Sequence, residues 1–438
     1  MKVSVIGLGY LGVTHAVAMA ELGHQVLGIE PDQRKFDLLS QGIVPFHEPG
    51  LDAALGKALA SGRLTLEKAM SSSLASADLH FICVGTPQTQ GSEAADTSYV
   101  FAAAKELAQH IRPDAVVAGK STVPVGTATE LRSLMSEVAG FSVKLAWNPE
   151  FLREGTALED SLRPDRIVVG AWDEEAVSAL RECYSSILEL GTPFLVLDVP
   201  TAELVKVAAN AFLATKISFI NAMAEVSEAA GADAVALAKA IGYDERIGNK
   251  FLRTGIGFGG GCLPKDIRGF IARADELGVG SAVDFLKDVD AINLRRRDRV
   301  VALAKAELGE VSGKRIAMLG ISFKPDSDDL RDSPALDIAL RLSRAGAVVT
   351  VHDPVSLDAL AVKEPALARE AEMVEALREA DLVILGTEWK QYKEADPEIL
   401  GSVVASKNII DGRNVLDVEA WQAAGWKVTA LGRSIVNG

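Results

Sequence analysis

A glycine-rich segment between Gly255 and Asp266 brings together the most reactive side chains of the sequence. Five glycines lead to Cys262, and Pro264 and Asp266 follow it. Glycine lets the backbone approach a ligand closely, and proline suits the first turn of a helix. We therefore expect Cys262 directly before a helix N-terminus, where the partial positive charge favours a thiolate. Such a thiolate could act as a covalent nucleophile; the alternative is a tight turn that carries a small buried residue.

Two pairs of polar residues spaced by four are candidates for acid–base or charge-stabilising groups. Glu150 and Glu154 would share one face if their segment is helical, and would otherwise be solvated acids. Lys206 and Asn210 lie in an apolar, helix-like run, so each needs a polar partner inside the fold. The alternative for Lys206 is a side chain that extends to solvent.

The other reactive residue types show no metal-site or disulfide pattern. The three cysteines are widely spaced, and Cys83 and Cys183 lie in segments that predict a structural, buried role. The six histidines show neither a base–nucleophile arrangement nor metal-ligand spacing, so we expect no bound metal. Lys324, Arg331 and Arg413 lie at turns near the C-terminus and would suit a phosphate or carboxylate ligand.

The first elements of the chain form a dinucleotide-binding pattern. A strand at 3–6 runs into Gly7-Leu-Gly-Tyr-Leu-Gly12, a helical segment ends near residue 22, and a strand at 25–29 leads to Glu30. The glycines permit a tight turn, the approach of a pyrophosphate and close helix packing, while the acid binds ribose hydroxyls. An acid at position 30 favours NAD over NADP. The turn residues expected to bind NAD are Gly7, Gly9, Tyr10, Leu11 and Gly12.

Alternating strands and helices continue this first domain. Strands are expected at 77–84, 115–118, 167–170 and 194–197. Strand ends of a parallel sheet face the ligand crevice. Thr86 and Thr122 follow two of these strands, so they either contact cofactor or substrate or cap the helices that follow.

A long, alanine-rich helix then precedes a second α/β region. The helix is expected from Thr201, which would cap it, to about residue 230, with Glu203 in its first turn. After residue 311, strands at 315–320, 347–353 and 380–387 repeat the order of the first domain. Here the first turn reads Gly320-Ile-Ser-Phe-Lys-Pro325 and lacks the dinucleotide fingerprint. The same architecture without that fingerprint suggests a different, nucleotide-like ligand.

The predicted fold class is therefore α/β, with two doubly wound Rossmann-like domains joined by a long central helix. We place an NAD-binding domain at 1–200, a central helical domain with the cysteine loop at 201–310, and the second Rossmann-like domain at 311–438. Two or three domains suit a chain of 438 residues. A long helix between two α/β regions is also a natural dimer surface.

The composition excludes some classes of partner. The formal net charge of −15 argues against nucleic acid, because binding a phosphate backbone needs a basic face. With 48% hydrophobic and 24% charged residues, the chain is typical of a globular protein. We find no signal peptide and no apolar run of about 18 residues that predicts a membrane span. A reducing cytoplasm is therefore the expected location.

A series of short motifs runs in one order along essentially the whole chain. The motifs are Gly7 to Gly12, Glu48-Pro-Gly-Leu51, Val84-Gly-Thr-Pro87, Ser121-Thr-Val-Pro124, Asn148-Pro-Glu-Phe-Leu-Arg-Glu154, Glu203 to Asn210, Arg246-Ile-Gly248, Gly257 to Asp266, Ser322-Phe-Lys-Pro325, Asp328-Asp-Leu-Arg331 and Asp411-Gly-Arg413. With these motifs the chain resembles the UDP-glucose/GDP-mannose dehydrogenases, a family of nucleotide-sugar dehydrogenases. Glu30 stands where aspartate is commoner, and Gly261 stands where serine is commoner; neither change removes a reacting group.

The resemblance implies oxidation of UDP-glucose at C6 to UDP-glucuronate with two NAD⁺ and one water. Cys262 would attack the intermediate aldehyde to give a thiohemiacetal, and a second oxidation would give a thioester that water hydrolyses. Lys206 and Asn210 would stabilise the oxyanion. Asp266 would orient or deprotonate water, and Glu154 would act as a general base through a water held by Thr122.

The resemblance also assigns binding residues and an assembly. Arg246 would reach the sugar site of a neighbouring subunit, so a homodimer through the central helix is expected. The second Rossmann-like domain would bind the UDP-sugar. The residues expected around NAD, beside the glycine-rich turn, are Glu30, Lys35, Thr86, Thr122, Glu154 and Arg331. Those expected around the UDP-sugar are Glu150, Phe151, Lys206, Asn210, Arg246, Arg253, Phe258, Gly259, Lys324 and Arg413.

Three other functions remain open at this point. GDP-mannose or a UDP-N-acetylhexosamine could replace UDP-glucose, with the same cysteine and the same four-electron chemistry. A two-electron β-hydroxyacid dehydrogenase shares the N-terminal domain and long helix, but has neither the cysteine nor a second α/β domain. A nucleotide-sugar sensor without activity would require loss of reacting groups, yet Cys262, Lys206 and Asp266 are all present. Uronate supply for polysaccharide synthesis is the usual role of the family.

Overall fold

The chain folds into two compact units. The computed structural model describes residues 1–433. The first unit comprises Met1–Ala209 with Arg268–Gly280, and the second comprises Asn210–Ile267 with the chain from Ser281 onward. The chain passes between the units at three points: within α9 (Val199–Ala230), within α11 (Leu263–Glu276) and within the 3-10 helix at Gly280–Ala282.

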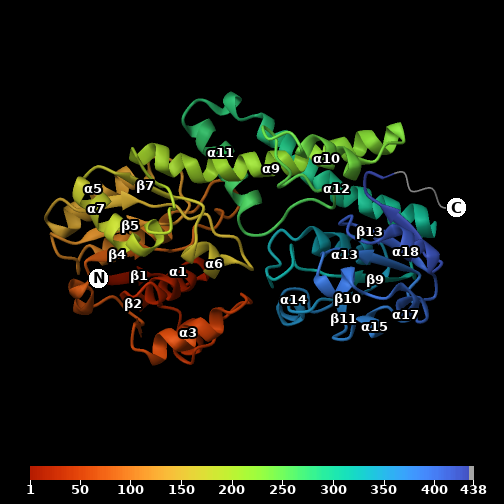
Figure 1. Ribbon diagram of the computed structural model, residues 1–438, viewed down its shortest axis with the longest axis horizontal. Helices are drawn as coiled ribbons and strands as arrows, with labels where there is room; N and C mark the ends of the chain where they lie inside the picture. Colours follow the sequence, from red (N-terminus) through yellow and green to blue (C-terminus); the bar gives the residue numbers. More distant parts are fainter. Residues whose placement is uncertain (434–438) are drawn as a thin grey trace. The chain divides into compact units, whose positions relative to one another are not determined.

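The first unit is built around eight strands, drawn in red to yellow in Figure 1. They are β1 (Lys2–Ile6), β2 (Gln25–Ile29), β3 (Leu64–Glu67), β4 (Leu79–Ile82), β5 (Val116–Gly119), β6 (Lys144–Trp147), β7 (Ile167–Ala171) and β8 (Phe194–Leu197). They form one sheet in the order β3-β2-β1-β4-β5-β6-β7-β8. Neighbouring strands are parallel except β6 and β7.

Both faces of this sheet are apolar and are covered by helices, because successive side chains of a strand point to opposite faces. Val3 and Val5 of β1 belong to one cluster and Ile6 to another. Strands β4 and β5 are buried along their whole length, as parallel strands covered on both faces should be. The helices are α1 (Tyr10–Glu21), α2 (Gln33–Ser40), α3 (Leu51–Ala60), α4 (Ser98–Leu107), α5 (Thr127–Ala139), α6 (Ala157–Leu162), α7 (Glu174–Cys183) and α8 (Ser185–Leu188), with a 3-10 helix at Ser72–Ser76.

The second unit contains a six-stranded parallel sheet in the order β11-β10-β9-β12-β13-β14. Its strands, blue in Figure 1, are β9 (Arg315–Leu319), β10 (Val348–His352), β11 (Ala368–Arg369), β12 (Leu382–Leu385), β13 (Asn408–Asp411) and β14 (Lys427–Ala430). The order β10-β9-β12-β13 repeats β2-β1-β4-β5 of the first sheet. The predicted fold class, two doubly wound domains and a long helix, is confirmed.

The remaining helices belong to the second unit or pass between the two. They are α10 (Ala234–Gly242), α12 (Phe285–Leu308), α13 (Pro334–Arg344), α14 (Leu357–Lys363), α15 (Met373–Ala376), α16 (Lys390–Lys393), α17 (Pro397–Gly401) and α18 (Val418–Ala423), with a 3-10 helix at Gly280–Ala282. The predicted boundaries at residues 200 and 310 stay predictions, since compactness alone yields two units.

The start of α9 differs from the sequence-based expectation. The helix begins at Val199, and the Asp198 carboxylate accepts a hydrogen bond from the Thr201 amide at 2.8 Å. Asp198 therefore takes the capping role that we expected of Thr201. Glu203 consequently lies beyond the first turn, which contains no acid, and its carboxylate is free to bind elsewhere.

One helix within residues 1–433 meets the length and composition of a membrane span. This helix is α9, and 44% of its most apolar window is buried in the fold. The expectation of no such apolar run was therefore wrong as a statement about composition. Long core helices of water-soluble proteins meet the same criteria, so the feature is weak evidence for a membrane.

Candidate active site

The glycine-rich turn after β1 has the backbone geometry that a dinucleotide requires. Gly7 has a positive φ of 85°, and a Cβ on Gly12 would lie 1.8 Å from the Gly7 carbonyl oxygen. A Cβ on Gly9 would meet nothing within 4 Å. Gly9 directly precedes α1, whose N-terminus has no side-chain cap. The turn therefore leaves space and unsatisfied amides where a pyrophosphate binds a helix N-terminus, and the residues present fit NAD.

Glu30 lies beside this turn at the end of β2. Its side chain is buried and accepts hydrogen bonds from the amides of Leu8 and Asp32, both at 3.0 Å. The acid thus lies beside the glycine-rich turn, as the sequence predicts; its binding of a ribose diol stays a prediction. Lys35, also expected near NAD, lies exposed on α2.

Glu48 joins the glycine-rich turn to the loop after β6, a connection that the sequence did not reveal. Its buried carboxylate accepts a hydrogen bond from the Tyr10 hydroxyl and bonds of 2.6 and 2.7 Å from the amides of Gly155 and Ala157. Burial, followed by the bond to Glu48, raises the pKa of Tyr10 far above its ordinary value. Tyr10 therefore stays neutral and holds the turn in place.

The threonines after β4 and β5 contact each other. The Thr86 hydroxyl donates to the Thr122 carbonyl oxygen at 2.7 Å, so neither caps a following helix through this bond. The helix after Thr122, α5, is capped instead by Glu203 of α9, which accepts from the amides of Gly126 and Ala128 at 2.8 and 2.7 Å. Glu203 thereby fixes the loop that carries Thr122 to the helix that carries Lys206.

Glu150 and Lys206 form a buried ion pair. The Lys206 Nζ lies 2.9 Å from Glu150 Oε1, and the two side chains are 5% and 13% exposed. Phe151 packs beside them, with its ring centre 5.7 Å from the Lys206 Nζ. The interpretations of Lys206 as a surface residue and of Glu150 as a solvated acid are both wrong.

The segment that carries Glu150 and Glu154 is a loop, so the two acids do not share a helix face. Glu150 accepts a hydrogen bond from the Leu152 amide at 2.5 Å, a local bond that competes with helix formation. Glu154 is half-buried at the end of this loop. Its role as a base stays a prediction.

A buried polar cluster anchors the start of the same loop. Asn148 accepts from the Lys120 Nζ at 3.0 Å and from the Tyr184 hydroxyl at 2.8 Å, and donates to the Val168 carbonyl oxygen at 2.8 Å. Burial lowers the pKa of Lys120. Because β5 and β6 end at this cluster, it fixes the direction in which the Glu150 loop leaves the sheet.

Cys262 lies where the sequence predicts, directly before α11. The Asp266 amide donates to the Cys262 carbonyl oxygen at 2.9 Å, which makes Cys262 the N-cap residue of the helix. Its side chain is exposed, whereas Cys83 and Cys183 are buried, and burial raises the pKa of each of those thiols to about 12. Cys262 is therefore the cysteine available for chemistry at neutral pH.

Asp266 and Asn210 meet one helical turn from the cysteine. The Asn210 Nδ2 donates to Asp266 Oδ2 at 2.6 Å, and Lys265 Nζ lies 2.6 Å from Asp266 Oδ1. Asn210 also lies one turn beyond Lys206 along α9. The structure thus gives both polar residues of the apolar helix a carboxylate partner, as the burial argument requires.

The basic residues of the second unit are engaged with neighbouring groups of that unit. Arg413 donates to the carbonyl oxygens of Gly386, Gly257 and Phe323 at 2.7, 3.1 and 3.0 Å. Both Arg413 and Arg253 pair with Glu388 at 3.3 Å, an acid that the sequence analysis did not single out although it follows a strand end. Lys324 lies half-buried next to the Phe323 ring.

Two further arginines explain features of the sequence. Arg331 pairs with Asp329 at 2.7 Å, and its guanidinium carbon would lie 2.2 Å from a Cβ on Gly261. The guanidinium therefore occupies the space that the commoner serine would need at position 261. The Arg246 side chain is 89% exposed and pairs with Asp244 at 2.6 Å, and its reach into another subunit stays a prediction.

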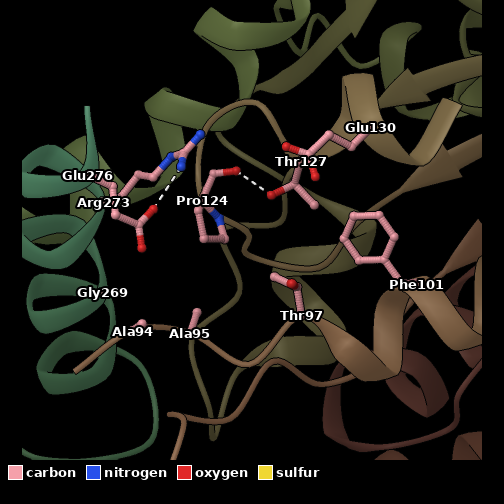
Figure 2. A pocket seen from close by; sticks show the side chains of 10 residues that line it. All are labelled: Ala94, Ala95, Thr97, Phe101, Pro124, Thr127, Glu130, Gly269, Arg273 and Glu276. Carbon is pink, nitrogen blue, oxygen red and sulfur yellow. Dashed lines mark hydrogen bonds and ion pairs between the residues drawn. The ribbon is translucent and has the colours of Figure 1, made fainter. Parts of the chain in front are cut away.

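A cavity of about 170 Å³ lies within the first unit behind the Thr122 loop. Figure 2 shows Arg273 of α11 paired with Glu276 on one side, and Thr127 bonded to Pro124 on the other. Arg273 Nε also donates to the Val125 carbonyl oxygen at 3.0 Å. None of the predicted site residues lines this cavity.

Comparisons with known proteins agree along the whole chain. Three models of the UDP-glucose/GDP-mannose dehydrogenase family match it: the NAD-binding domain at 1–188, the central domain at 200–295 and the UDP-binding domain at 317–418. The UDP-glucose 6-dehydrogenase YwqF of Bacillus subtilis is 39% identical over 100% of this chain and 98% of its own length. The UDP-glucose 6-dehydrogenase of Rhizobium meliloti is 38% identical over 99% and 100%.

A solved structure supports the same relationship. It is that of a UDP-glucose dehydrogenase from the hyperthermophilic archaeon Pyrobaculum islandicum, which is 39% identical to this chain. The match has a TM-score of 0.88 and covers 97% of this chain and 98% of the other. The fold and the sequence therefore point to one family.

Proposed function

The chain belongs to the UDP-glucose/GDP-mannose dehydrogenase family, and on that premise we propose that it oxidises UDP-glucose at C6 to UDP-glucuronate. The cofactor is NAD, for which the first unit carries the family's binding domain and a fitting turn. Support for the substrate comes from relatives of nearly equal length that bear the name UDP-glucose 6-dehydrogenase. The observation that carries the chemistry is the exposed Cys262 at the start of α11, one turn from Asp266.

The reaction removes two hydrides and adds one water at a single carbon. NAD⁺, when bound at the Gly7–Gly12 turn, supplies the hydride acceptor for each oxidation. In the first oxidation the C6 alcohol loses a proton and a hydride and becomes an aldehyde. Glu154 is the proposed base, acting through a water held by Thr122.

The second oxidation needs a covalent intermediate, and we assign the nucleophile to Cys262. Its thiolate forms a C–S bond with the aldehyde carbon to give a thiohemiacetal, whose loss of a hydride leaves a thioester. Lys206 and Asn210 stabilise the negative oxygen of this tetrahedral species. Water then adds to the thioester, the C–S bond breaks, and the carboxylate and the free thiolate are released.

Asp266 is proposed to orient the hydrolytic water. Both of its oxygens accept hydrogen bonds, from Asn210 and Lys265, which favours an orienting role over proton abstraction. The UDP-sugar would be held by Glu150, Phe151, Arg253, Phe258, Gly259, Lys324 and Arg413. Thr86, Lys35 and Arg331 would complete the NAD site with Glu30.

Replacement of Cys262 tests the covalent step. Cys262→Ala removes the nucleophile, so turnover to the uronate should cease after at most one NADH per sugar. Cys262→Ser keeps a weaker nucleophile, and intact-mass measurement should reveal an accumulated acyl ester. Uronate formation by either variant at the wild-type rate would reject the assignment.

A substrate panel tests the choice of sugar nucleotide. UDP-glucose, GDP-mannose and UDP-N-acetylglucosamine share the C6 alcohol that Cys262 chemistry requires, so NADH formation with each reports recognition alone. We expect a kcat/KM for UDP-glucose at least about 100-fold above the others, the range that missing or clashing polar contacts produce. Preference for GDP-mannose would overturn the proposed substrate.

We also propose a homodimer formed through α9. Phe212, Phe219 and Val226 are spaced by seven residues on one stripe of the helix and are 67%, 49% and 58% exposed. Such a stripe is typical of a helix that packs against a partner. Light scattering should show a dimer for the wild type and a monomer for Phe219→Glu. Val362→Glu, at an exposed residue of α14, serves as the matched control and should remain dimeric.

The resemblance implies that Arg246 reaches the sugar site of the neighbouring subunit, and mixing two inactive variants tests this. Arg246→Ala and Cys262→Ala should each be inactive alone. After subunit exchange, a mixed dimer has one site with both residues, so activity should return. Proven exchange without recovery would contradict the shared site. We propose the cytoplasm as location, because the chemistry assigned to Cys262 needs a reduced thiol.

A further inference from the structure

The loop that leads to Cys262 is held by buried side chains of two helices. At its start, the Gly255 amide donates to Asn221 Oδ1 of α9 at 2.9 Å. The Gly255 carbonyl oxygen accepts from Arg296 Nε of α12 at 3.2 Å. Both side chains are fully buried. The amide and the carbonyl oxygen of Gly255, the first residue of the loop, are therefore both held by hydrogen bonds.

Asn293 of α12 holds the middle of the loop in the same manner. Its Oδ1 accepts from the Phe258 amide at 2.7 Å, and its Nδ2 donates to the Phe258 carbonyl oxygen at 3.0 Å. The side chain is 1% exposed. One amide group thus satisfies both backbone groups of one loop residue, which defines the position and the orientation of that peptide.

The backbone around Phe258 leaves no room for another arrangement. Gly257 has a φ of 96°, and a Cβ there would lie 2.3 Å from Asn293 Oδ1. On the far side, the Gly260 amide donates to the Arg331 carbonyl oxygen at 2.8 Å. A Cβ on Gly259 would lie 2.4 Å from the Asp332 carbonyl oxygen. The loop is therefore enclosed between α12 and residues 331–332.

From these contacts we propose that Asn293 is a positioning residue for the Cys262 thiol. Only three residues lie between Phe258 and Cys262, and their backbone is confined. A displaced Phe258 peptide would therefore move the start of α11. The role rests on the proposed nucleophilic function of Cys262. The sequence alone does not indicate this role of Asn293, since the residue lies in a charged helix far along the chain from the glycine-rich segment.

The test compares Asn293→Ala with a control that removes an equally buried contact of the same helix. Ser218 of α9 is fully buried and donates to the Val289 carbonyl oxygen of α12 at 2.7 Å, without touching the loop. Ser218→Ala should lower thermal stability and leave kcat within about twofold. Asn293→Ala should lower kcat on the order of 10- to 100-fold, the effect of a reacting group displaced by about 1 Å, with KM for NAD⁺ unchanged.

Alkylation of Cys262 provides a readout independent of turnover. Cys83 and Cys183 are buried, so iodoacetamide at pH 7 should modify Cys262, and mass spectrometry measures the rate. We expect a rate about two- to fivefold lower in Asn293→Ala, because the thiolate loses its alignment with the helix N-terminus. An unchanged rate and an unchanged kcat in a folded Asn293→Ala would overturn the proposal.

Asn293→Asp keeps the size of the side chain and guards against misfolding of the alanine variant. Its ionised carboxylate still accepts from the Phe258 amide but opposes the Phe258 carbonyl oxygen. Protonation restores the donor, so the ratio of its kcat to that of wild type should rise as pH falls. A ratio independent of pH would contradict the proposed bond. If Cys262→Ala remained active while alkylation responded to Asn293, the proposed catalytic function would fail and the positioning role would stand.

Discussion

The first turns of the two sheets use one architecture in two ways. After β1, the turn packs backbone against backbone: a Cβ on Gly12 would lie 1.8 Å from the Gly7 carbonyl oxygen, and Gly9 faces open space. After β9, the turn carries Ile321 and Ser322, which are both buried. The first turn leaves open space at Gly9, whereas the second buries the side chains of Ile321 and Ser322 within its own unit.

The acids at the ends of the second strands differ in the same sense. Glu30 accepts one amide bond from the turn, from Leu8. Asp353 accepts three bonds from Ile321 and Ser322 through Oδ2 and two more amide bonds through Oδ1. Glu30 retains capacity to accept ribose hydroxyls, while Asp353 is committed to holding its turn together. Strand order therefore sets where a ligand can lie, and the turn residues decide which ligand.

Substitutions at Gly12 and Gly9, in the turn after β1, should have the largest effect on the difference in ligand binding between the two turns. Gly12→Ala forces the turn apart and should weaken NAD⁺ binding more than about 100-fold, close to 3 kcal/mol, as measured by calorimetry. Gly9→Ala is the matched variant: its Cβ meets no protein atom, so the melting temperature should hold while NAD⁺ affinity falls. UDP binding should be unaffected in both. Normal NAD⁺ binding by Gly9→Ala would show that the dinucleotide does not use this turn.

Acid should weaken the first unit before the second. Burial lowers the pKa of His80 in β4 to about 4 and also lowers those of His15 and His24; in the second unit burial lowers that of His352. The unfolded chain takes up these protons below about pH 6.5, so stability is full above that pH and falls as pH decreases. The shifted pKa of His80 alone should lower the free energy of unfolding by about 3 kcal/mol between pH 7 and pH 4.

Hydrogen exchange at pH 7 and pH 5 locates this acid effect. Protection of β1 and β4 should drop more than protection of β9 and β12. His80→Asn should reduce the pH dependence of the melting temperature, because the titrating group is gone. Equal loss of protection in both sheets would contradict the assignment to the buried histidines of the first unit.

Replacing Asp353 or Glu30 by its amide should have the smallest effect. We expect the first change to act on stability and the second on NAD⁺ affinity. Asp353→Asn replaces one accepting oxygen by an NH₂ group, which then faces amides that also donate. The free energy of unfolding should therefore fall by about 1–3 kcal/mol, with NAD⁺ affinity unchanged. Glu30→Gln should raise the Kd for NAD⁺ about tenfold, close to 1.4 kcal/mol, with little change in stability. If both variants changed the same quantity, the two acids would not have the separate roles described.

The local features of the site could be predicted from the sequence. Cys262 precedes a helix because Pro264 favours a first turn, and Glu30 ends a strand next to a glycine-rich turn. The partners of Lys206 and Asn210 were required by burial, although their identity was not evident. These features were predictable because each depends on residues that are near in the sequence.

Contacts between distant segments could not be predicted in this way. Glu48 bonds Gly155, Glu203 caps α5, and Asn293 holds Phe258. Each pair is brought together by the packing of whole elements, which composition and spacing do not encode. Spacing also left open whether Glu150 and Glu154 share a helix face, and they do not, because the Leu152 amide donates to the Glu150 carboxylate within a loop.

We propose that a single active site carries out both oxidations at C6 through a covalent bond to Cys262. The most direct measurement is the number of NADH molecules formed per UDP-glucose when the sugar is limiting. We predict two NADH and one UDP-glucuronate, with no free aldehyde. One NADH per sugar, with an aldehyde as the final product, would rule out the four-electron oxidation.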